Sequence, residues 1–141
     1  GAGEVTALLL AAILARPVAL VDTVYWAARR AGIDPVLAVA VVEYESWFDP
    51  SKDVACGDTT DWGLFQLNSR YHVQHRESID KHIAYGVAYL AECLAREKGS
   101  RTAGLSRYNA GAAASVAGRL YAARVLAIWR RLMIAAGKGK A

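Results

Sequence analysis

Apolar residues recur along much of this chain at helical spacing. The clearest case follows Ser78, where one face of the segment up to Lys98 is apolar, formed by Ile79, Ile83, Val87, Leu90 and Leu94. This spacing matches the 3.6-residue period of an α-helix, and a serine is a favourable N-cap. The pattern therefore predicts a long helix over 78–98 that turns this face toward a core.

Proline, aspartate and glycine mark the helix boundaries in the N-terminal half. Pro17 suits a first turn, Asp34-Pro35 combines an N-cap with a first-turn proline, and Gly32 suits a helix end. Asp49-Pro50 disfavours continuation of the third helix beyond about Trp47. Together with the apolar spacing, these signals predict further helices over 5–15, 17–31, 34–47, from about 102 to 108, and 119–136.

The segment between the third helix and the long helix has a different pattern. Residues 49–60 are polar and contain glycine, proline and aspartate, which indicates a loop. Residues 62–67 could form a short strand or hairpin. The chain has 141 residues, 55% of them apolar, with only 3 prolines. This suits one mainly α domain over 1–141 with an ordinary core.

The first apolar run, residues 5–15, is too short for a membrane span. It has about eleven residues, whereas a transmembrane helix needs roughly 20. No basic stretch precedes it, as one does in a signal peptide. A helix that contributes to the core is the expectation.

Charge is distributed unevenly along the chain. Residues 1–97 carry 8 Lys or Arg against 13 Asp or Glu, whereas residues 98–141 carry 9 basic residues and no acidic ones. Such asymmetry suggests that the basic end meets a polyanion, for example a cell-wall polymer, lipopolysaccharide or anionic lipid. The alternative is a solvated helix face. Nucleic acid is not expected as a partner, because no recognised binding motif accompanies the charge.

Cysteine and histidine give no indication of a metal or cofactor. Cys56 and Cys93 are the only cysteines and lack zinc-ligand spacing. Free thiols are favoured over one disulfide, because nothing in the chain establishes an oxidising compartment. His72, His75 and His82 are expected to be surface or structural residues. We expect neither a metal nor a cofactor.

Two glutamates near the end of the third helix are candidates for acid catalysis. A carboxyl group in an apolar setting has a raised pKa, and such a group can protonate a glycosidic oxygen near neutral pH. Glu43 and Glu45 are two residues apart on a helix, so only one can face a given cleft. Glu45 is the better candidate because it adjoins the loop. Spacing alone also allows the alternative that Glu45 is simply an exposed glutamate at a helix end, with no role in catalysis.

Three short motifs resemble those of soluble lytic transglycosylases and goose-type lysozymes. They are Glu45-Ser46 at the end of an apolar helix, Gly63-Leu-Phe-Gln66, and Tyr108-Asn-Ala-Gly111. They occur in the family's order, and the resemblance covers about residues 33–130. The segment 60–70 also looks like the active-site hairpin of hen-type lysozymes, although the hen-type cysteine pattern is absent. This resemblance implies an α+β lysozyme-like fold, a helical bundle around a central helix with a small β-hairpin at the cleft.

The resemblance implies a function and several roles. The chain would be a muramidase that cleaves the β-1,4 bond between N-acetylmuramic acid and N-acetylglucosamine in peptidoglycan, with Glu45 as general acid. The ring of Tyr108 would act beside Glu45 or simply close the cleft floor. The residues expected to bind substrate are Ser46, Gly63, Gln66, Asn68, Tyr108 and Asn109.

A second catalytic carboxylate is less defined. Asp58 follows Gly57, like a water-positioning aspartate of goose-type lysozymes, whereas Asp61 matches the nucleophile or charge stabiliser of the hen-type hairpin. A further acidic position of the goose-type motif corresponds to Asn68. Either aspartate could instead be an ordinary loop residue. We favour hydrolysis with Asp61 ahead of Asp58. The alternative is a lytic transglycosylase, which needs no second carboxylate because Glu45 acts first as acid and then as base.

The expected setting follows from this reaction. The protein would act as a monomer in the cell wall or periplasm, either secreted or encoded by a phage and released to the periplasm. An alternative of another class is a glycan- or membrane-binding module that acts through the basic C-terminal helix, because residues 119–133 have amphipathic spacing.

Overall fold

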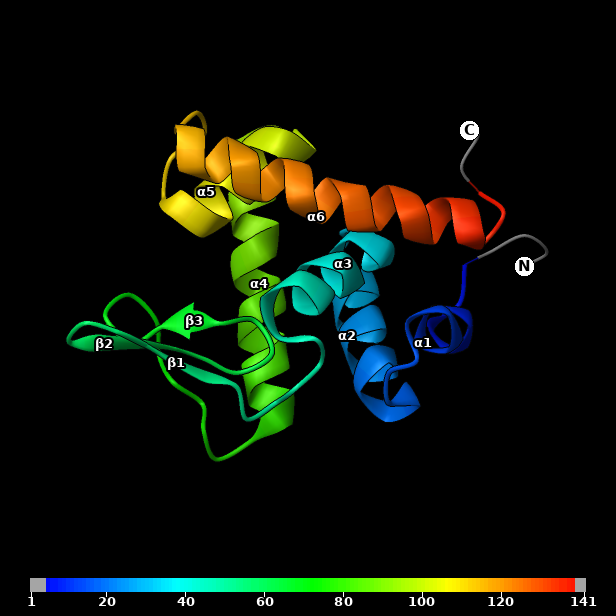
Figure 1. Cartoon of the computed structure of the whole chain (residues 1–141), viewed down its shortest axis with the longest axis horizontal. Coiled ribbons are helices and arrows are strands. Elements are labelled where there is room, and N and C mark those ends of the chain that lie inside the picture. Colours follow the sequence, from blue (N-terminus) through cyan, green and yellow to red (C-terminus); the bar gives the residue numbers. More distant parts are fainter. Residues whose placement is uncertain (1–4, 139–141) are drawn as a thin grey trace.

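The computed structural model describes residues 5–138 of the chain. Within this range it has six helices and one three-stranded sheet (Figure 1). The helices are α1 (Ala7–Leu14), α2 (Val18–Arg30), α3 (Pro35–Ser46), α4 (Ile79–Arg96), α5 (Arg101–Ala110) and α6 (Val116–Ala135), and the strands are β1 (Asp53–Cys56), β2 (Thr59–Trp62) and β3 (Leu67–Asn68). This is the mainly α, lysozyme-like architecture expected from the sequence.

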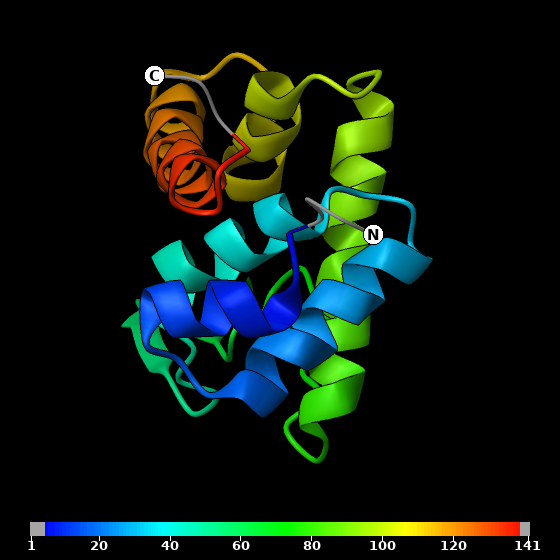
Figure 2. The same cartoon turned by 90° about the vertical axis from the view of Figure 1, so that its right-hand side faces the viewer.

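Helix α3 is the central helix. All residues from Val36 to Glu43 are buried, because a helix that is apolar on every side must be surrounded by other elements. Helices α2 and α6 both pack against it, and Figure 2 shows α3 (cyan) between them. Asp34 caps the helix by accepting hydrogen bonds from the Val36 and Leu37 amides, as its position before Pro35 predicts.

The buried Glu43 lies in the last turn of α3 and forms an ion pair with Arg16. Both of its carboxylate oxygens accept from Arg16, at 2.8 Å from Nη2 and 3.0 Å from Nε. A buried carboxylate needs such a bidentate partner to offset its desolvation. Arg16 lies in the connection between α1 and α2, so this ion pair attaches that connection to the central helix.

The sheet corrects one expectation and decides between the alternatives of another. The segment 49–60, expected to be a loop, contains β1 and part of β2, which form an antiparallel hairpin. Of the short strand or hairpin expected over 62–67, the hairpin is confirmed: β2 ends at Trp62, residues 63–66 form a turn, and β3 starts at Leu67, which pairs with Trp62. The residues of β1 are all exposed. A strand without a buried face has no need of apolar alternation, so its sequence resembles that of a loop.

The turn at 63–66 is anchored to α4. Its residues Leu64 and Phe65 are fully buried, and the Phe65 amide donates to Nε2 of His82 at 3.0 Å. His82 is itself buried, and burial lowers its pKa to about 4. A neutral ring is required here because Nε2 acts as an acceptor. His82 is therefore a structural histidine, as the sequence indicated.

The C-terminal helices form the rest of the core. Ser78 caps α4 as expected, although Ile79, assigned to its apolar face, is exposed in the first turn. Helix α6 begins three residues before the expected position, after Ser115, whose hydroxyl accepts from the Gly118 amide. The core-facing residues of α6 are Tyr121, Ala122, Val125, Leu126 and Leu132.

Two sequence expectations concern the cysteines and the membrane. Cys56 and Cys93 are both free thiols, which confirms the preference over a disulfide; Cys93 is buried and Cys56 is exposed on β1. Over residues 5–138, no helix combines the length and apolar character that a membrane crossing requires.

The close packing of the turn against His82 gives a first prediction. Gly63 has φ +84°, and a Cβ added there would lie 2.6 Å from the His82 ring. Gly57 also has a positive φ, +68°, but a Cβ there would meet nothing within 4 Å. Gly63→Ala should therefore lower the free energy of unfolding by about 1 to 2 kcal/mol more than Gly57→Ala does. Urea titrations of both variants measure this difference, and equal losses would contradict the close contact.

Candidate active site

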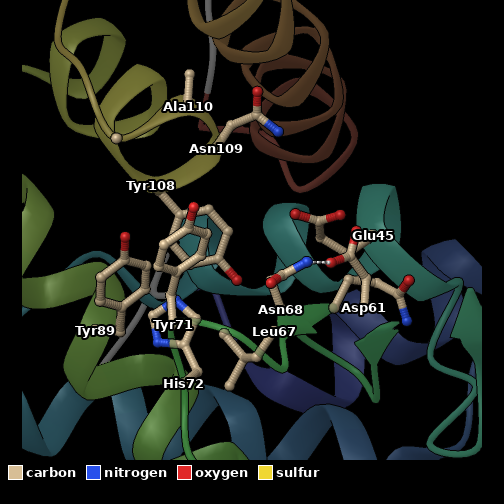
Figure 3. Close-up of a pocket in the computed structure, with 12 residues that line it drawn as sticks. Glu45, Asp61, Leu67, Asn68, Tyr71, His72, Tyr89, Tyr108, Asn109 and Ala110 are labelled. Carbon is tan, nitrogen blue, oxygen red and sulfur yellow. Dashed lines mark hydrogen bonds between the residues drawn. The ribbon is translucent and has the colours of Figure 1, made fainter. Parts of the chain in front are cut away.

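A cleft of about 670 Å³ opens where the sheet meets the helices (Figure 3). Its walls come from the end of α3, from β2 and β3, from the segment after β3, and from α4 and α5. The lining residues are Glu45, Asp61, Gln66, Leu67, Asn68, Tyr71, His72, Tyr89, Tyr108, Asn109, Ala110 and Gly111. The cleft thus joins segments from the middle of the chain to the turn that follows α5.

Glu45 enters the cleft from the last turn of α3. Burial raises the pKa of its carboxyl group from 4.5 to about 7, opposed by a hydrogen bond from Tyr121. The negative charge of Asp61 raises the pKa further, whereas the positive charge of Lys52 lowers it. A carboxyl group with this pKa carries its proton for part of the time at neutral pH, which is what a general acid requires.

Tyr121 of α6 fixes the orientation of the Glu45 carboxyl group. Its hydroxyl donates to Oε2 of Glu45 at 2.8 Å. The Tyr121 ring is buried, lies edge-on to Tyr44 with a centroid distance of 5.4 Å, and stacks on Tyr108 at 6.2 Å. Because Tyr44 and Tyr108 fix the Tyr121 ring, the hydrogen bond from its hydroxyl also fixes the Glu45 carboxyl group. Oε2 is engaged with the protein, which leaves Oε1 as the better oxygen to carry a proton toward a ligand.

Lys52 stabilises the same end of α3. Its Nζ donates to the Glu45 carbonyl oxygen at 2.7 Å and lies 5.3 Å from the centre of the exposed Trp47 ring. A cation at a helix C-terminus compensates the partial negative charge of the last carbonyls. Trp47 has the left-handed conformation, with φ 53°, that ends the helix directly after Ser46.

Asp61 is the other carboxylate of the cleft. It pairs with Asn68 across β2 and β3, and its Oδ1 accepts from the Asn68 amide at 2.8 Å. Its Oδ2 accepts from Sγ of Cys56 at 3.4 Å. Figure 3 shows the Asp61–Asn68 hydrogen bond beside Glu45 and opposite the tyrosines. The sheet register therefore holds Asp61 on the same side of the cleft as Glu45.

Asp58 lies outside the cleft. It is exposed in the turn between β1 and β2, where both of its carboxylate oxygens accept from Nη2 of Arg70, at 2.9 and 3.0 Å. Of the two aspartates singled out from the sequence, the structure brings only Asp61 together with Glu45.

Two of the expected substrate-binding residues do not line the cleft. Ser46 is fully buried, and its hydroxyl donates to the carbonyl oxygens of Leu64, at 2.9 Å, and Val42, at 3.2 Å. Gly63 packs against the His82 ring. Both residues connect the 63–66 turn to its neighbours, because Ser46 ties it to α3 and Gly63 lets it approach α4. Both residues therefore help to hold the turn in place and do not line the cleft.

The other four expected residues do line the cleft, in different ways. The Gln66 amide nitrogen donates to the carbonyl oxygens of Lys52 and Gly63, at 3.1 and 2.9 Å, which holds the turn in place. Tyr108 is buried, and its hydroxyl donates to the Phe65 carbonyl oxygen at 2.7 Å. Tyr108 thus closes the cleft floor and makes no hydrogen bond to Glu45. Asn68 bonds Asp61, and Asn109 is exposed on the opposite wall.

Several cleft residues were missed by the sequence analysis. Tyr71 is 73% exposed at the cleft, and His72 packs on Tyr89 with a centroid distance of 4.3 Å. Flat rings at a cleft are suited to packing against apolar faces of a ligand. Tyr71 and His72 directly follow the hairpin motif, and this proximity is the one signal that could have found them. Tyr121 had no signal beyond its place on an amphipathic helix.

Comparison with known proteins finds one family. The sequence model of the transglycosylase SLT domain matches residues 22–119, well over half of the chain. A search of curated proteins found no match. The matched segment contains Glu45, Asp61 and Tyr108, and it ends just before Tyr121, which holds the Glu45 carboxyl group.

The raised pKa of Glu45 predicts a pH-dependent cost in stability. In the unfolded chain this group loses its proton near its ordinary pKa of 4.5, and in the folded protein near 7. The folded state therefore loses stability as the pH rises through this interval, by about 3 kcal/mol in total. Glu45→Gln carries no such charge, so it should become more stable than the unmodified protein at about pH 8 and lose this advantage at about pH 4.5.

Urea unfolding of both proteins at the two pH values measures the effect. Asp58→Asn is the matched control, because it removes an exposed carboxylate outside the cleft, and it should not produce the same gain at high pH. Parallel pH curves for Glu45→Gln and the unmodified protein would contradict the raised pKa.

Proposed function

This chain belongs to the transglycosylase SLT domain family, and we propose that it cleaves the β-1,4 bond between N-acetylmuramic acid and N-acetylglucosamine with Glu45 as general acid. The family consists of peptidoglycan-cleaving glycosidases and lytic transglycosylases, so the chain is an enzyme of this kind. Its substrate is peptidoglycan, and its place of action is the cell wall or periplasm. The bond cleaved and the residue roles are the proposal.

The observation that supports this proposal is the state of Glu45. Its carboxyl group has a pKa of about 7 because of burial, and Tyr121 binds one of its oxygens. A glycosidic oxygen is a weak base and leaves only when it is protonated as the bond breaks. An acid that is protonated near neutral pH, fixed in orientation and placed at a cleft is suited to this step.

In the first half of the proposed reaction, the proton moves from Glu45 to the bridging oxygen. The bond from this oxygen to C1 of the muramoyl sugar breaks, and the N-acetylglucosamine strand leaves with a free 4-hydroxyl group. Positive charge develops on C1 and the ring oxygen. Asp61, on the same side of the cleft as Glu45, would stabilise this charge through its own negative charge.

In the second half, the Glu45 carboxylate takes the proton of the muramoyl 6-hydroxyl while that oxygen attacks C1. This closes a 1,6-anhydro ring and returns Glu45 to its protonated form. A group with a pKa of about 7 can serve in both directions at neutral pH. Because this route needs no second carboxylate and agrees with the family, we favour transglycosylation over the hydrolysis preferred from the sequence alone.

Hydrolysis is the second candidate, and Asp61 is the reason to keep it. It is the other carboxylate lining the cleft, and a second carboxylate is what retaining and inverting glycosidases use to complete hydrolysis. Asp58 has no part in either proposal because Arg70 holds it outside the cleft. Its proposed role is to stabilise the β1–β2 turn.

Substrate contacts are proposed for the polar and aromatic residues that line the cleft. Asn68 and Asn109 face it from opposite walls, and Gln66 lies in the turn between the two strands. Amide groups of this kind can both donate to and accept from sugar hydroxyl and N-acetyl groups. The exposed ring of Tyr71 offers a flat apolar surface for a sugar face. Ser46 and Gly63 are proposed as supporting residues that do not touch substrate.

The basic C-terminal helix fits a supporting role better than a separate membrane activity. Most large apolar residues in the middle of α6, such as Val125, Leu126 and Leu132, are buried in the core, so they are not available for insertion into a bilayer. Its arginines Arg119 and Arg131 are exposed. We propose that they contact the anionic cell envelope and thereby concentrate the enzyme near its substrate.

The general-acid role predicts the effect of Glu45→Gln. The variant keeps the shape of the side chain but has no proton to give, so clearing of purified peptidoglycan should slow by about 100-fold or more. Asp58→Asn is the control and should clear peptidoglycan at close to the unmodified rate. Thermal melting of both variants verifies that they are folded. Undiminished clearing by folded Glu45→Gln would refute the role of Glu45.

The mass of the released muropeptides decides how the reaction ends. Transglycosylation predicts 1,6-anhydromuramoyl ends, which are lighter by one water molecule than the reducing ends that hydrolysis leaves. Mass spectrometry after complete digestion, with borohydride reduction as a second check, distinguishes them because only reducing ends take up hydrogen. Reducing ends throughout would establish the second candidate in place of the first.

A further inference from the structure

A second hollow, of about 280 Å³, lies between α3 and α6 and is also lined by Glu45. It shares Glu45 and Asn109 with the main cleft. Its remaining lining residues are Tyr44, Ala117, Leu120, Tyr121 and Arg124. The two spaces therefore adjoin each other at the candidate acid, and the proposed reaction described above uses only the first.

Arg124 gives this hollow its charge. Its Nη1 donates to the Tyr44 hydroxyl at 3.4 Å, which directs the guanidinium toward α3. Arg124 has no ion pair with any carboxylate of residues 5–138. Apart from Glu45, it is the only residue lining the hollow that carries a charge. An oriented guanidinium without a carboxylate partner is well suited to bind one from a ligand.

The rest of the hollow combines apolar side chains, two tyrosine rings and one amide. Leu120 is 51% exposed and stands beside Ala117, one turn before Arg124 on the same helix. The rings of Tyr44 and Tyr121 form the opposite side. The exposed Asn109 amide lies at the border with the main cleft. A ligand that fits this surface has an amide near Asn109, a small apolar group against Leu120 and a carboxylate at Arg124.

We propose that the hollow binds the carboxylate-bearing peptide attached to the muramic acid sugar at the cleavage point. This inference rests on the proposed function, because that function places a muramoyl sugar beside Glu45. In peptidoglycan, a lactyl group on this sugar carries a short peptide with small apolar side chains and free carboxylates. Arg124 binds one carboxylate of this peptide, and Leu120 packs against an alanine-sized group. The enzyme thereby selects peptide-bearing strands over stripped ones.

The other exposed arginines of α6 differ from Arg124 in their surroundings. Arg130 and Arg131 are exposed on the same helix but line neither hollow. An isolated surface cation contributes little binding free energy, because water already solvates it. Arg130 is therefore the matched control. It carries the same charge as Arg124 and is also exposed on α6. Unlike Arg124, it does not line the hollow that contains Tyr44 and Glu45.

The test compares two substrates and two variants. One substrate is peptidoglycan with intact peptides, and the other is the same material after an amidase has removed the peptides. For each, kcat/KM is measured for the unmodified enzyme, Arg124→Gln and Arg130→Gln. The unmodified enzyme should prefer the peptide-bearing strands, and Arg124→Gln should reduce that preference by roughly 3- to 10-fold. Arg130→Gln should keep it. Equal losses on both substrates, or no loss on either, would overturn the inference.

A binding measurement separates this inference from the proposed function. Glu45→Gln, which should bind without cleaving, is titrated calorimetrically with a disaccharide-peptide and with the same compound after amidation of its carboxylates. The free acid should bind several-fold more tightly, and the further change Arg124→Gln should remove the difference. Should the enzyme cleave neither substrate, the proposed function fails while this titration still decides the role of Arg124. Equal affinity for both compounds would refute it.

Discussion

The burial of a helix that is apolar on every side from Val36 to Val42 is the constraint on which the rest of the structure depends. Because α3 has no polar face, the other elements must surround it, and a charged group on it must be paired or lie at its end. Glu43 shows the first outcome, through its ion pair with Arg16. Glu45 shows the second, since it emerges where the helix stops and the cleft begins. The same burial that builds the core thus raises the pKa of the candidate acid.

The 63–66 turn is the second fixed point of the site. Ser46 connects it to α3, His82 to α4 and Tyr108 to α5, each through a hydrogen bond to a main-chain group. Since β2 and β3 adjoin the turn on either side, the position of Asp61 relative to Glu45 is set by these three contacts. Residues of the recognisable motifs therefore act in two ways, some by facing the cleft and others by holding the turn that shapes it.

Helix α6 carries both the residue that orients the candidate acid and the residue proposed to bind the peptide. Tyr121 faces inward and orients the carboxyl group of Glu45, while Arg124, less than one turn later, faces the second hollow. A polymeric substrate that fills both hollows passes across Glu45 between them. Orientation of the acid and recognition of the peptide next to the scissile bond would then both depend on α6. A peptide bound at Arg124 would therefore place the scissile bond correctly relative to Glu45.

The sequence by itself determined the helices, the choice of Glu45 over Glu43 and the resemblance that names the reaction class. The helices depend on caps, prolines and apolar spacing, the choice of Glu45 on its place next to the loop, and the resemblance on three short motifs. Each of these signals lies within a few residues. It did not determine that β1 is a strand, that Asp61 and not Asp58 faces the cleft, or that Tyr121 holds Glu45 from 76 residues away. The first depends on pairing with the neighbouring strand β2, and the other two on contacts between segments that are farther apart in the chain. Only tertiary packing brings such segments together, and no local signal specifies which side chains will then meet.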